Sequence, residues 1–257
     1  MLGDAAKTAL ASSRFSDVQW VEETGSTNAD LLAKARAGAP EGVVLVANHQ
    51  TAGRGRSGRT WTAPPNASLL LSVLVRPTPQ LAGLSTMAMG LAAADAVEST
   101  AQFRPRLKWP NDLVWPGDGS SPDRKLAGIL AEAHWPSTGE AAVIIGIGIN
   151  VNWPANLPDD LEEIAIAVNH VAGHDVDREL LLVDLLLHFD HRYDELGSAA
   201  LLDAWRASSA TLGRRVRVDL GSEQIEGMAQ DVTPDGHLLV DGREITAGDV
   251  VHLRPAD

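Results

Sequence analysis

The spacing of hydrophobic and polar residues divides the chain into segments that predict strands and helices in a mixed order. Short apolar or alternating runs bounded by glycine, proline or polar residues predict strands. These strands lie at 18–23, 42–50, 67–77, 125–135 and 141–151, with two shorter ones around a proline corner within 106–115. Longer segments with helical spacing predict helices at 25–38, 81–100, 177–196 and 201–213.

The order of these elements indicates the fold class. The strands at 125–135 and 141–151 follow one another without a helix between them, so the chain does not consist of repeated βαβ units. We therefore expect an α+β main domain with a mixed, largely antiparallel sheet. From about Arg214 onward, short alternating segments separated by glycine-rich turns predict about five strands, in the size range of an SH3-like β-barrel. The predicted domains are residues 1–210 and residues 211–257.

Composition narrows the classes of function. The chain has 257 residues and a formal charge of -13, which argues against broad nucleic-acid binding because that affinity comes mainly from neutralised phosphates. It contains no cysteine, which excludes disulfides, thiolate nucleophiles and cysteine-ligated zinc. The N-terminus lacks a signal-peptide pattern, and the longest apolar run, at 141–151, is too short to cross a bilayer. We therefore expect a cytoplasmic protein without membrane association.

Residues 49–61, HQTAGRGRSGRTW, combine glycine spacing with a cluster of arginines. The glycines fit the G-x-G-x-x-G template of a dinucleotide-binding loop, but the residues that follow are proline-rich and predict a strand, so no helix N-terminus is available for a pyrophosphate. The three arginines repel one another unless an anion neutralises them. We expect an anion-binding loop in which backbone N–H groups and guanidiniums bind a phosphate or carboxylate. The alternative is a solvated basic surface loop.

Four further motifs are ambiguous when each is taken alone. GSTN at 25–28 is explained by a helix N-cap. KWPNDL at 108–113 is explained by a turn, although Lys108 in a predicted strand then needs an anion or water as partner. KLAGIL begins with Lys125, which is either an edge lysine or a cation at the mouth of a pocket, with Gly128 leaving room for a ligand. In GIGIN, the glycines are typical of a close approach by a ligand or backbone, and Asn150 could contact a base or ribose.

The motifs GSTN, HQTAGRGRSGRTW, LKWPNDL, KLAGIL and GIGINVN occur in this order and together resemble biotin–protein ligase, also called biotin–[acetyl-CoA-carboxylase] ligase. The resemblance is strong over about residues 19–152, and the C-terminal β segment is similar to the closing domain of that family. It implies a class II aminoacyl-tRNA-synthetase-like domain, related also to lipoate ligases, whose seven-stranded mixed sheet carries helices on one side. It also implies two reactions. Biotin and Mg-ATP give biotinyl-5'-AMP and pyrophosphate, and a lysine of an acceptor domain then displaces AMP.

The resemblance assigns roles to the matching positions. Substrate binding is implied for Ser26, Thr27, Asn28, Gln50, Gly53, Arg54, Gly55, Arg56, Lys125 and Gly128, and nucleotide binding for Arg56, Arg59, Trp61, Lys108, Asn111 and Asn150. Arg56, Lys108 and Lys125 are the expected catalytic residues, because joining two anions requires their charges to be neutralised. Asp112 is the expected Mg²⁺ ligand. The arginine loop is expected to be mobile without ligand and to order over biotinyl-AMP as a lid.

The expected substrates are ATP and biotin with Mg²⁺, and the expected partner is the biotin carboxyl carrier domain of acetyl-CoA/acyl-CoA or pyruvate carboxylase. Some family members carry an N-terminal helix-turn-helix domain, whereas only about 17 residues precede the first predicted strand here, so we expect a ligase that does not bind DNA. A monomer and a weak homodimer are both compatible with the resemblance. The segment PGDGSSPD, residues 116–123, lies outside the motif pattern and predicts a flexible loop.

Two alternatives stay open at this point. A lipoate–protein ligase would have the same chemistry on a related fold, but lipoyl tails are apolar, whereas GSTN and Gln50 offer the hydrogen bonds that the ureido ring of biotin needs. A non-catalytic nucleic-acid-binding protein would use the arginine loop and the β module, and the acidic net charge disfavours it.

Overall fold

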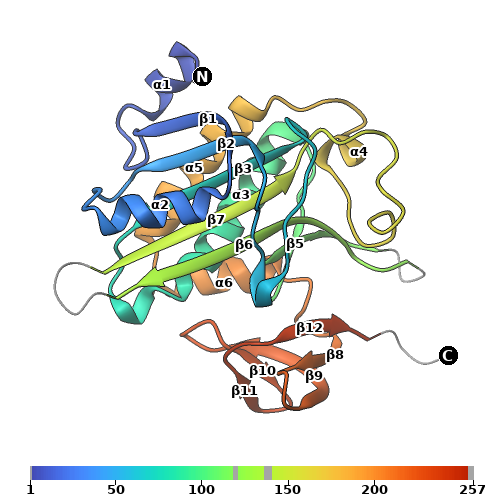
Figure 1. Ribbon diagram of the computed structural model, residues 1–257. Helices are drawn as coiled ribbons and strands as arrows, with labels where there is room; N and C mark the ends of the chain where they lie inside the picture. Colours follow the sequence, from blue (N-terminus) through green and yellow to red (C-terminus); the bar gives the residue numbers. More distant parts are fainter. Residues whose placement is uncertain (1, 118–120, 136–140, 254–257) are drawn as a thin grey trace.

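A seven-stranded sheet forms the centre of the main part of the molecule (Figure 1), in a computed structural model that describes residues 2–117, 121–135 and 141–253. Its strands are β1 (Val18–Thr24), β2 (Val44–Gln50), β3 (Ser68–Val75), β4 (Arg106–Lys108), β5 (Asp112–Trp115), β6 (Arg124–His134) and β7 (Ala142–Asn150), in the spatial order β1-β2-β3-β7-β6-β5-β4. Strands β1 and β2 are parallel, and the other neighbours pair antiparallel. The mixed, largely antiparallel sheet is therefore confirmed.

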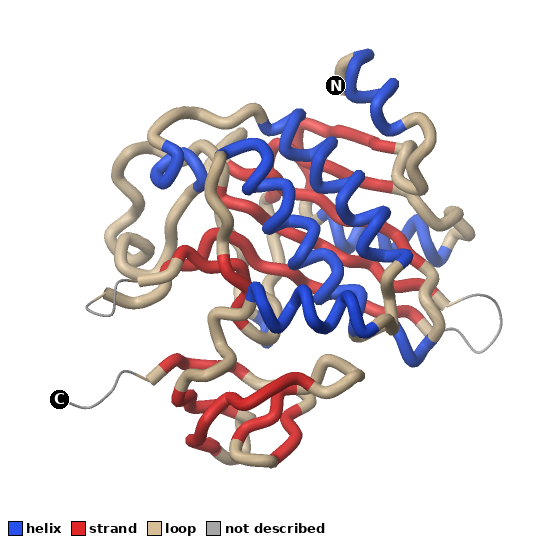
Figure 2. Tube along the Cα trace, turned by 180° about the vertical axis from the view of Figure 1, so that it is seen from behind, coloured by secondary structure: helices blue, strands red, loops and turns tan. Residues whose placement is uncertain are grey.

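Helices cover both faces of this sheet. The long helices α3 (Leu84–Ala101), α5 (Arg178–Asp194) and α6 (Ala199–Ser208) lie together on one face (Figure 2). On the other face lies α2 (Thr27–Arg36), which packs Leu31 and Ala35 against Leu74 and Ile144. The expectation of helices on one side only was wrong. The central strand β3 is buried along its whole length because apolar elements cover it from both sides.

The longer predicted elements are confirmed, and the shortest ones were missed. Helices α1 (Asp4–Leu10) and α4 (Val168–Ala172) have too few turns to produce a recognisable helical period, as do the 3-10 segments Arg56–Gly58 and Pro79–Leu81. Residues 118–120 of the predicted loop at 116–123 lie outside the described residues, as does the predicted connection at 136–140. In the part of the chain that the structure describes, no helix is long and apolar enough to cross a membrane.

A second, smaller sheet is built from the C-terminal residues. Its strands are β8 (Arg215–Asp219), β9 (Gln224–Val232), β10 (Leu238–Val240), β11 (Arg243–Ile245) and β12 (Asp249–His252), in the order β11-β10-β9-β8-β12 with antiparallel neighbours. Buried and exposed residues alternate along β8, which is the pattern that predicted these strands. The domain boundary after residue 210 stays a prediction, since the Ala210 N–H still donates to the Leu107 carbonyl beside the first sheet.

Candidate functional site

The arginine loop, within residues 49–61, lies in the connection from β2 to β3 and extends in front of the sheet toward the C-terminal strands (Figure 1). Arg54 and Thr60 form an isolated antiparallel bridge, and the Gly55 N–H donates to the Arg59 carbonyl at 2.7 Å. A 3-10 turn at the tip has Ser57 in the left-handed region, with φ of 55°. The loop is therefore a narrow hairpin-like projection, and its arginines reach partners in three different segments, Glu132, Asn111 and Asp249.

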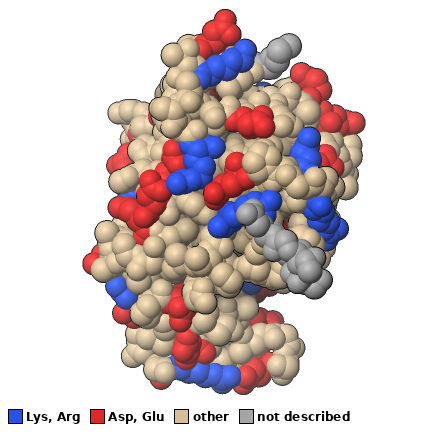
Figure 3. Space-filling view, turned by 90° about the vertical axis from the view of Figure 1, so that its left-hand side faces the viewer, with Lys and Arg blue, Asp and Glu red and all other residues tan. Residues whose placement is uncertain are grey.

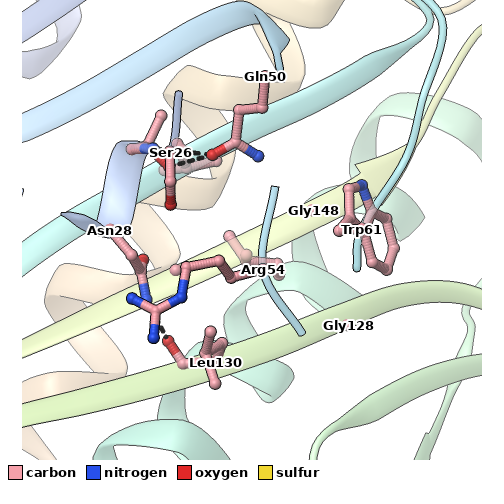
Figure 4. Close-up of a pocket in the computed structure, with 12 residues that line it drawn as sticks. Ser26, Asn28, Gln50, Arg54, Trp61, Gly128, Leu130 and Gly148 are labelled. Atoms are coloured by element: carbon pink, nitrogen blue, oxygen red, sulfur yellow. Dashed lines mark hydrogen bonds between the residues drawn. The ribbon is translucent and has the colours of Figure 1, made fainter. Parts of the chain in front are cut away.

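A small cavity of about 30 Å³ lies between the start of α2 and the sheet (Figure 4). Gln50 binds the start of the helix, because its Oε1 accepts from the Thr27 N–H at 2.8 Å and from the Thr27 hydroxyl at 3.1 Å. The Asn28 amide donates to the Leu130 carbonyl and to the Glu132 carboxylate, and its Oδ1 accepts from the Ser72 hydroxyl at 2.6 Å. Neutral hydrogen-bonding groups thus line one end of this cavity.

These contacts correct the explanation of GSTN as a simple helix N-cap. Ser26 occupies the N-cap position, but its side chain makes no capping hydrogen bond. The Thr27 N–H is instead satisfied by Gln50 from another strand. Ser26, Thr27 and Asn28 are all buried and line the cavity. Burial of such polar residues needs a network of partners, which a surface cap does not.

Glycines on β6 and β7 let large side chains lie directly on the sheet. Gly128 and Gly148 are opposite one another in the β6–β7 register. A Cβ added at Gly148 would lie 2.7 Å from Cε2 of Trp61, and one at Gly146 would lie 2.1 Å from Oδ1 of Asn28. The close approach predicted at these glycines is therefore made by side chains of the chain itself. The buried indole N–H of Trp61 has no hydrogen-bond partner within the described residues.

A larger cavity of about 350 Å³ adjoins the small one and carries most of the charged groups. Lys125 Nζ lies 2.7 Å from Asp112 Oδ1, and it also lies 5.5 Å from the centre of the Trp61 ring. Arg59 pairs with Asp249 of β12 at 2.6 Å, so the C-terminal sheet supplies part of the wall. Arg56 donates to Asn111 at 3.1 Å. Positive groups outnumber negative ones on this wall, which suits a polyanionic ligand.

Lys108 is the least compensated of these cations. Within the described residues it makes no ion pair, although it lines the larger cavity. Burial is the main cause that lowers the pKa of Lys108; Lys125 and Arg214 lower it further, while Asp112 and Asp123 act in the opposite direction. A half-buried ammonium without a paired carboxylate is costly, and an anionic ligand would reduce that cost.

Two side chains separate the cavities. Arg54, Trp61, Gly128 and Leu130 line both of them. Arg54 is held by an ion pair of 3.0 Å with Glu132, and Figure 4 shows its side chain reaching toward Asn28 while Trp61 lies near Gly148. A ligand long enough to occupy both cavities would therefore pass between Arg54 and Trp61.

The structure brings most of the predicted residues to these two cavities. The predicted residues that line the small cavity are Ser26, Thr27, Asn28, Gln50, Arg54, Trp61 and Gly128. Of these, Arg54, Trp61 and Gly128 also line the larger cavity, together with Gly55, Arg56, Arg59, Lys108, Asn111, Asp112 and Lys125. Gly53 and Asn150 are not brought there. A Cβ at Gly53 would lie 2.3 Å from the Trp61 carbonyl oxygen, so this glycine permits a close approach within the loop. Asn150 is buried and donates to the Ile166 carbonyl.

Sequence reasoning missed Glu132 and Asp249. Glu132 is the charged residue in the otherwise apolar stretch 126–133, and that pattern was available as a signal. Asp249 had no local signal, because its importance comes from the docking of β12 beside the arginine loop.

On the face shown in Figure 3, acidic and basic side chains are interspersed, without a continuous basic patch of the kind that binds nucleic acid.

Comparisons with known proteins agree with this arrangement. Residues 21–150 match the model of the biotin/lipoate A/B protein ligase family, and residues 211–253 match that of the biotin protein ligase C-terminal domain. The chain is 41% identical to the biotin–[acetyl-CoA-carboxylase] ligase of Mycobacterium tuberculosis, over 95% of this chain and 92% of that protein. The chain belongs to the biotin protein ligase family. The predicted family is thereby confirmed.

Other members of the family differ in length and share the fold. The bifunctional ligase/repressor BirA of Bacillus subtilis is 33% identical, over 80% of this chain but only 63% of that protein. The solved structure of biotin protein ligase from Aquifex aeolicus in complex with biotin and ATP has a TM-score of 0.77 and 28% identity, covering 93% of this chain and 100% of that one. This similarity confirms the predicted fold class, a mixed sheet with helices followed by a small β module.

Proposed function

We propose that this biotin–protein ligase activates biotin as biotinyl-5'-AMP and transfers it to a lysine of a biotin carboxyl carrier domain. The observation that carries the proposal is the meeting of two unlike cavities at Arg54 and Trp61. One is small, and its hydrogen-bonding side chains are neutral except for Arg54. The other is about 350 Å³ in volume and rich in cations. These properties suit a ureido ring at one end and a nucleotide at the other.

In the first reaction, a biotin carboxylate oxygen would attack the α-phosphorus of ATP, and the bond to the pyrophosphate oxygen would break. The chain has no need to supply a nucleophile, since biotin supplies it. Arg56, Lys108 and Lys125 would neutralise the carboxylate and the phosphates, which otherwise repel one another. Lys125 would exchange its ion pair with Asp112 for one with the substrate. In the second reaction, the acceptor amine would attack the acyl carbon and AMP would leave.

The residues present fit a magnesium ion that is held mainly by the nucleotide. No group of three or more potential metal-ligating side chains occurs among the described residues. Magnesium commonly takes one or two carboxylates together with substrate phosphates and water, so Asp112 would be sufficient as the ligand from the chain. When bound, the ion would add positive charge at the phosphates. The Asp112 carboxylate, released from its ion pair with Lys125, would then be available to hold the ion.

Biotin is favoured over lipoate by the polarity of the small cavity. The small cavity is lined by the hydrogen-bonding side chains of Thr27, Asn28 and Gln50, which suit a ureido ring, whereas a lipoyl tail has no polar groups to offer them. The carboxylase that provides the acceptor domain, the cytoplasmic location and the choice between monomer and weak dimer stay predictions.

Pyrophosphate release from ATP tests the proposal directly. The purified chain should release pyrophosphate when biotin is added, and it should release none with lipoate or without an acid. Biotin-dependent label should then move from the adenylate to an added carrier domain. Release that is equal with lipoate, or independent of biotin, would refute the assignment. Steeply salt-dependent binding of DNA or RNA would revive the nucleic-acid-binding alternative.

A further inference from the structure

A buried polar cluster joins the two sheets behind the larger cavity, and its centre is Asp123. The Asp123 carboxylate has a side-chain exposure of 7%, and it accepts from the Gly117 N–H at 3.0 Å and from Arg214 at 2.8 Å. It also lies 2.8 Å from Nδ1 of His252, which is 10% exposed. Asp123 precedes β6, and His252 ends β12, so this carboxylate connects the two parts of the molecule.

Hydrogen bonds extend from Asp123 to the backbone of the KWPN corner. His252 Nδ1 donates to Asp123, and the other ring nitrogen, Nε2, lies 3.2 Å from the Thr211 hydroxyl. That hydroxyl accepts from the Trp109 N–H at 3.0 Å and can therefore give its own proton to His252 Nε2. If His252 is neutral with its proton on Nδ1, the bonds among Asp123, His252, Thr211 and Trp109 have consistent donors and acceptors, and Arg214 Nη1, which lies 3.2 Å from the same Nδ1, donates to Asp123 at 2.8 Å. Burial is the main cause that lowers the pKa of His252 to about 4, and the charges that face the ring are Lys108, Asp123 and Arg214.

Both ends of this chain of hydrogen bonds lie next to walls of the larger cavity. Trp109 lines that cavity and follows Lys108 in the sequence. On the side of the C-terminal sheet, His252 directly follows Asp249–Val251, and these three residues line the cavity. A second hydrogen bond also joins the KWPN corner to the C-terminal part of the molecule, because the Trp109 indole donates to the Gly236 carbonyl at 3.1 Å. The cluster therefore fixes the distance between two walls that face the same ligand.

We infer that Asp123, His252 and Thr211 are positioning residues that hold the KWPN corner and β12 at the separation required for ATP. This inference rests on the proposed function, because it concerns the nucleotide end of that site. It also gives a role to the end of the segment at 116–123, which lies outside the motif pattern. Asp123 would act through His252 and Thr211, without touching the substrate itself.

A set of near-isosteric variants separates positioning from simple stabilisation. Thr211→Val keeps the shape but leaves the Trp109 N–H and His252 Nε2 unpaired. His252→Asn keeps a donor toward Asp123 and loses the acceptor toward Thr211. His252→Gln keeps an acceptor toward Thr211 and loses the donor toward Asp123. Thr100→Val is the matched control, since the Thr100 hydroxyl bonds only within its helix, to the Ala96 carbonyl at 2.7 Å.

The readout is the KM for ATP against the KM for biotin, with the melting temperature measured in parallel. We expect Thr211→Val and His252→Asn each to raise the KM for ATP about tenfold, the effect of one unpaired buried group, while the KM for biotin stays within about twofold. The double variant should be no worse than either single one, because both changes remove the same bond. His252→Gln should also raise the KM for ATP, and Thr100→Val should change neither constant.

Lower melting temperatures with an unchanged KM for ATP would overturn the inference and leave the cluster a purely structural one. An equal rise in both KM values would overturn it as well. If Thr211→Val does not fold, the two His252 variants decide, since each retains one of the two bonds. A wild-type chain without biotin-dependent pyrophosphate release would refute the proposed function, and this inference would fall with it. An active wild type whose folded variants keep their KM for ATP would refute this inference alone.

Discussion

Replacing Gly146 by alanine should damage biotin binding selectively. An alanine Cβ at this position would lie 2.1 Å from Asn28 Oδ1, whereas ordinary contacts begin at 3.4 Å. The oxygen must therefore move by about 0.9 Å to reach 3.0 Å, below which real Cβ contacts essentially never occur, and by about 1.3 Å to reach an ordinary contact. Gly146 belongs to the rigid, fully buried strand β7, so Asn28 and not the strand would move.

That displacement disturbs the hydrogen bonds made by the Asn28 side chain. Asn28 bonds to Leu130 at 3.1 Å, to Glu132 at 2.9 Å and to Ser72 at 2.6 Å, and a shift of this size breaks most of them. At about 1 kcal/mol for each bond, the loss is about 2–3 kcal/mol. If Asn28 orients the biotin head group, a similar loss in binding raises the KM for biotin by about 30- to 150-fold.

The assay is biotin-dependent pyrophosphate release at saturating ATP, with circular dichroism as a check on folding. Gly25→Ala is the matched control, because nothing lies within 4 Å of the added Cβ and Gly25 precedes the same helix. The control should keep both KM values. A folded Gly146→Ala variant with a normal KM for biotin would show that Asn28 does not lie at the biotin end of the site.

Four further predictions concern the loop, the lysine at the cavity and the interface cluster. Lys125→Ala should slow adenylate formation about 100-fold in single-turnover experiments, and a wild-type rate would remove Lys125 from the mechanism. Arg56→Ala should release biotinyl-AMP at least about tenfold faster, which a filter-binding chase measures; unchanged retention would show that its role was misassigned. Proteolysis within 54–59 should slow when biotinyl-AMP is bound, and equal cleavage would contradict the lid. The pKa of His252 is lowered from 6.5 to about 4, so the stabilisation from its neutral form is complete above pH 6.5 and is lost as the pH falls toward 4. The free energy of unfolding should fall by on the order of 3 kcal/mol over this window, and less in His252→Gln; identical pH slopes would refute the assignment.

The site residues that could be found in the sequence are those whose chemistry is conspicuous in their own segment. Arg56 stands out as a cation next to Gly55, Lys125 stands out as a cation at the start of the apolar KLAGIL stretch, and both lie at the larger cavity. The nucleotide contact expected for Asn150 stays a prediction, and this residue lines neither of the two cavities. It ends the correct strand, but its side chain meets the Ile166 carbonyl, and only the packing of the segment after β7 decides this.

Groups whose role depends on contacts between two distant segments could not be given that role from the sequence. Glu132 matters because Arg54 and Asn28 converge on it from different elements. His252 matters because β12 lies against residues that precede β6. Neither convergence leaves a periodic or compositional trace, since contacts between remote segments depend on how the elements pack.

The sequence by itself determined the longer elements, the fold class and the family, because hydrophobic period, turn residues and the order of motifs are local properties. It also predicted an anion site at the arginine loop, which stays a prediction, since in the structure Arg54 pairs with Glu132 and Arg59 with Asp249. Only the tertiary structure decided that two cavities meet at Arg54 and Trp61, and that the C-terminal sheet closes the larger of them. Those features arise from side chains that lie far apart in the chain and become neighbours only when the sheets are packed.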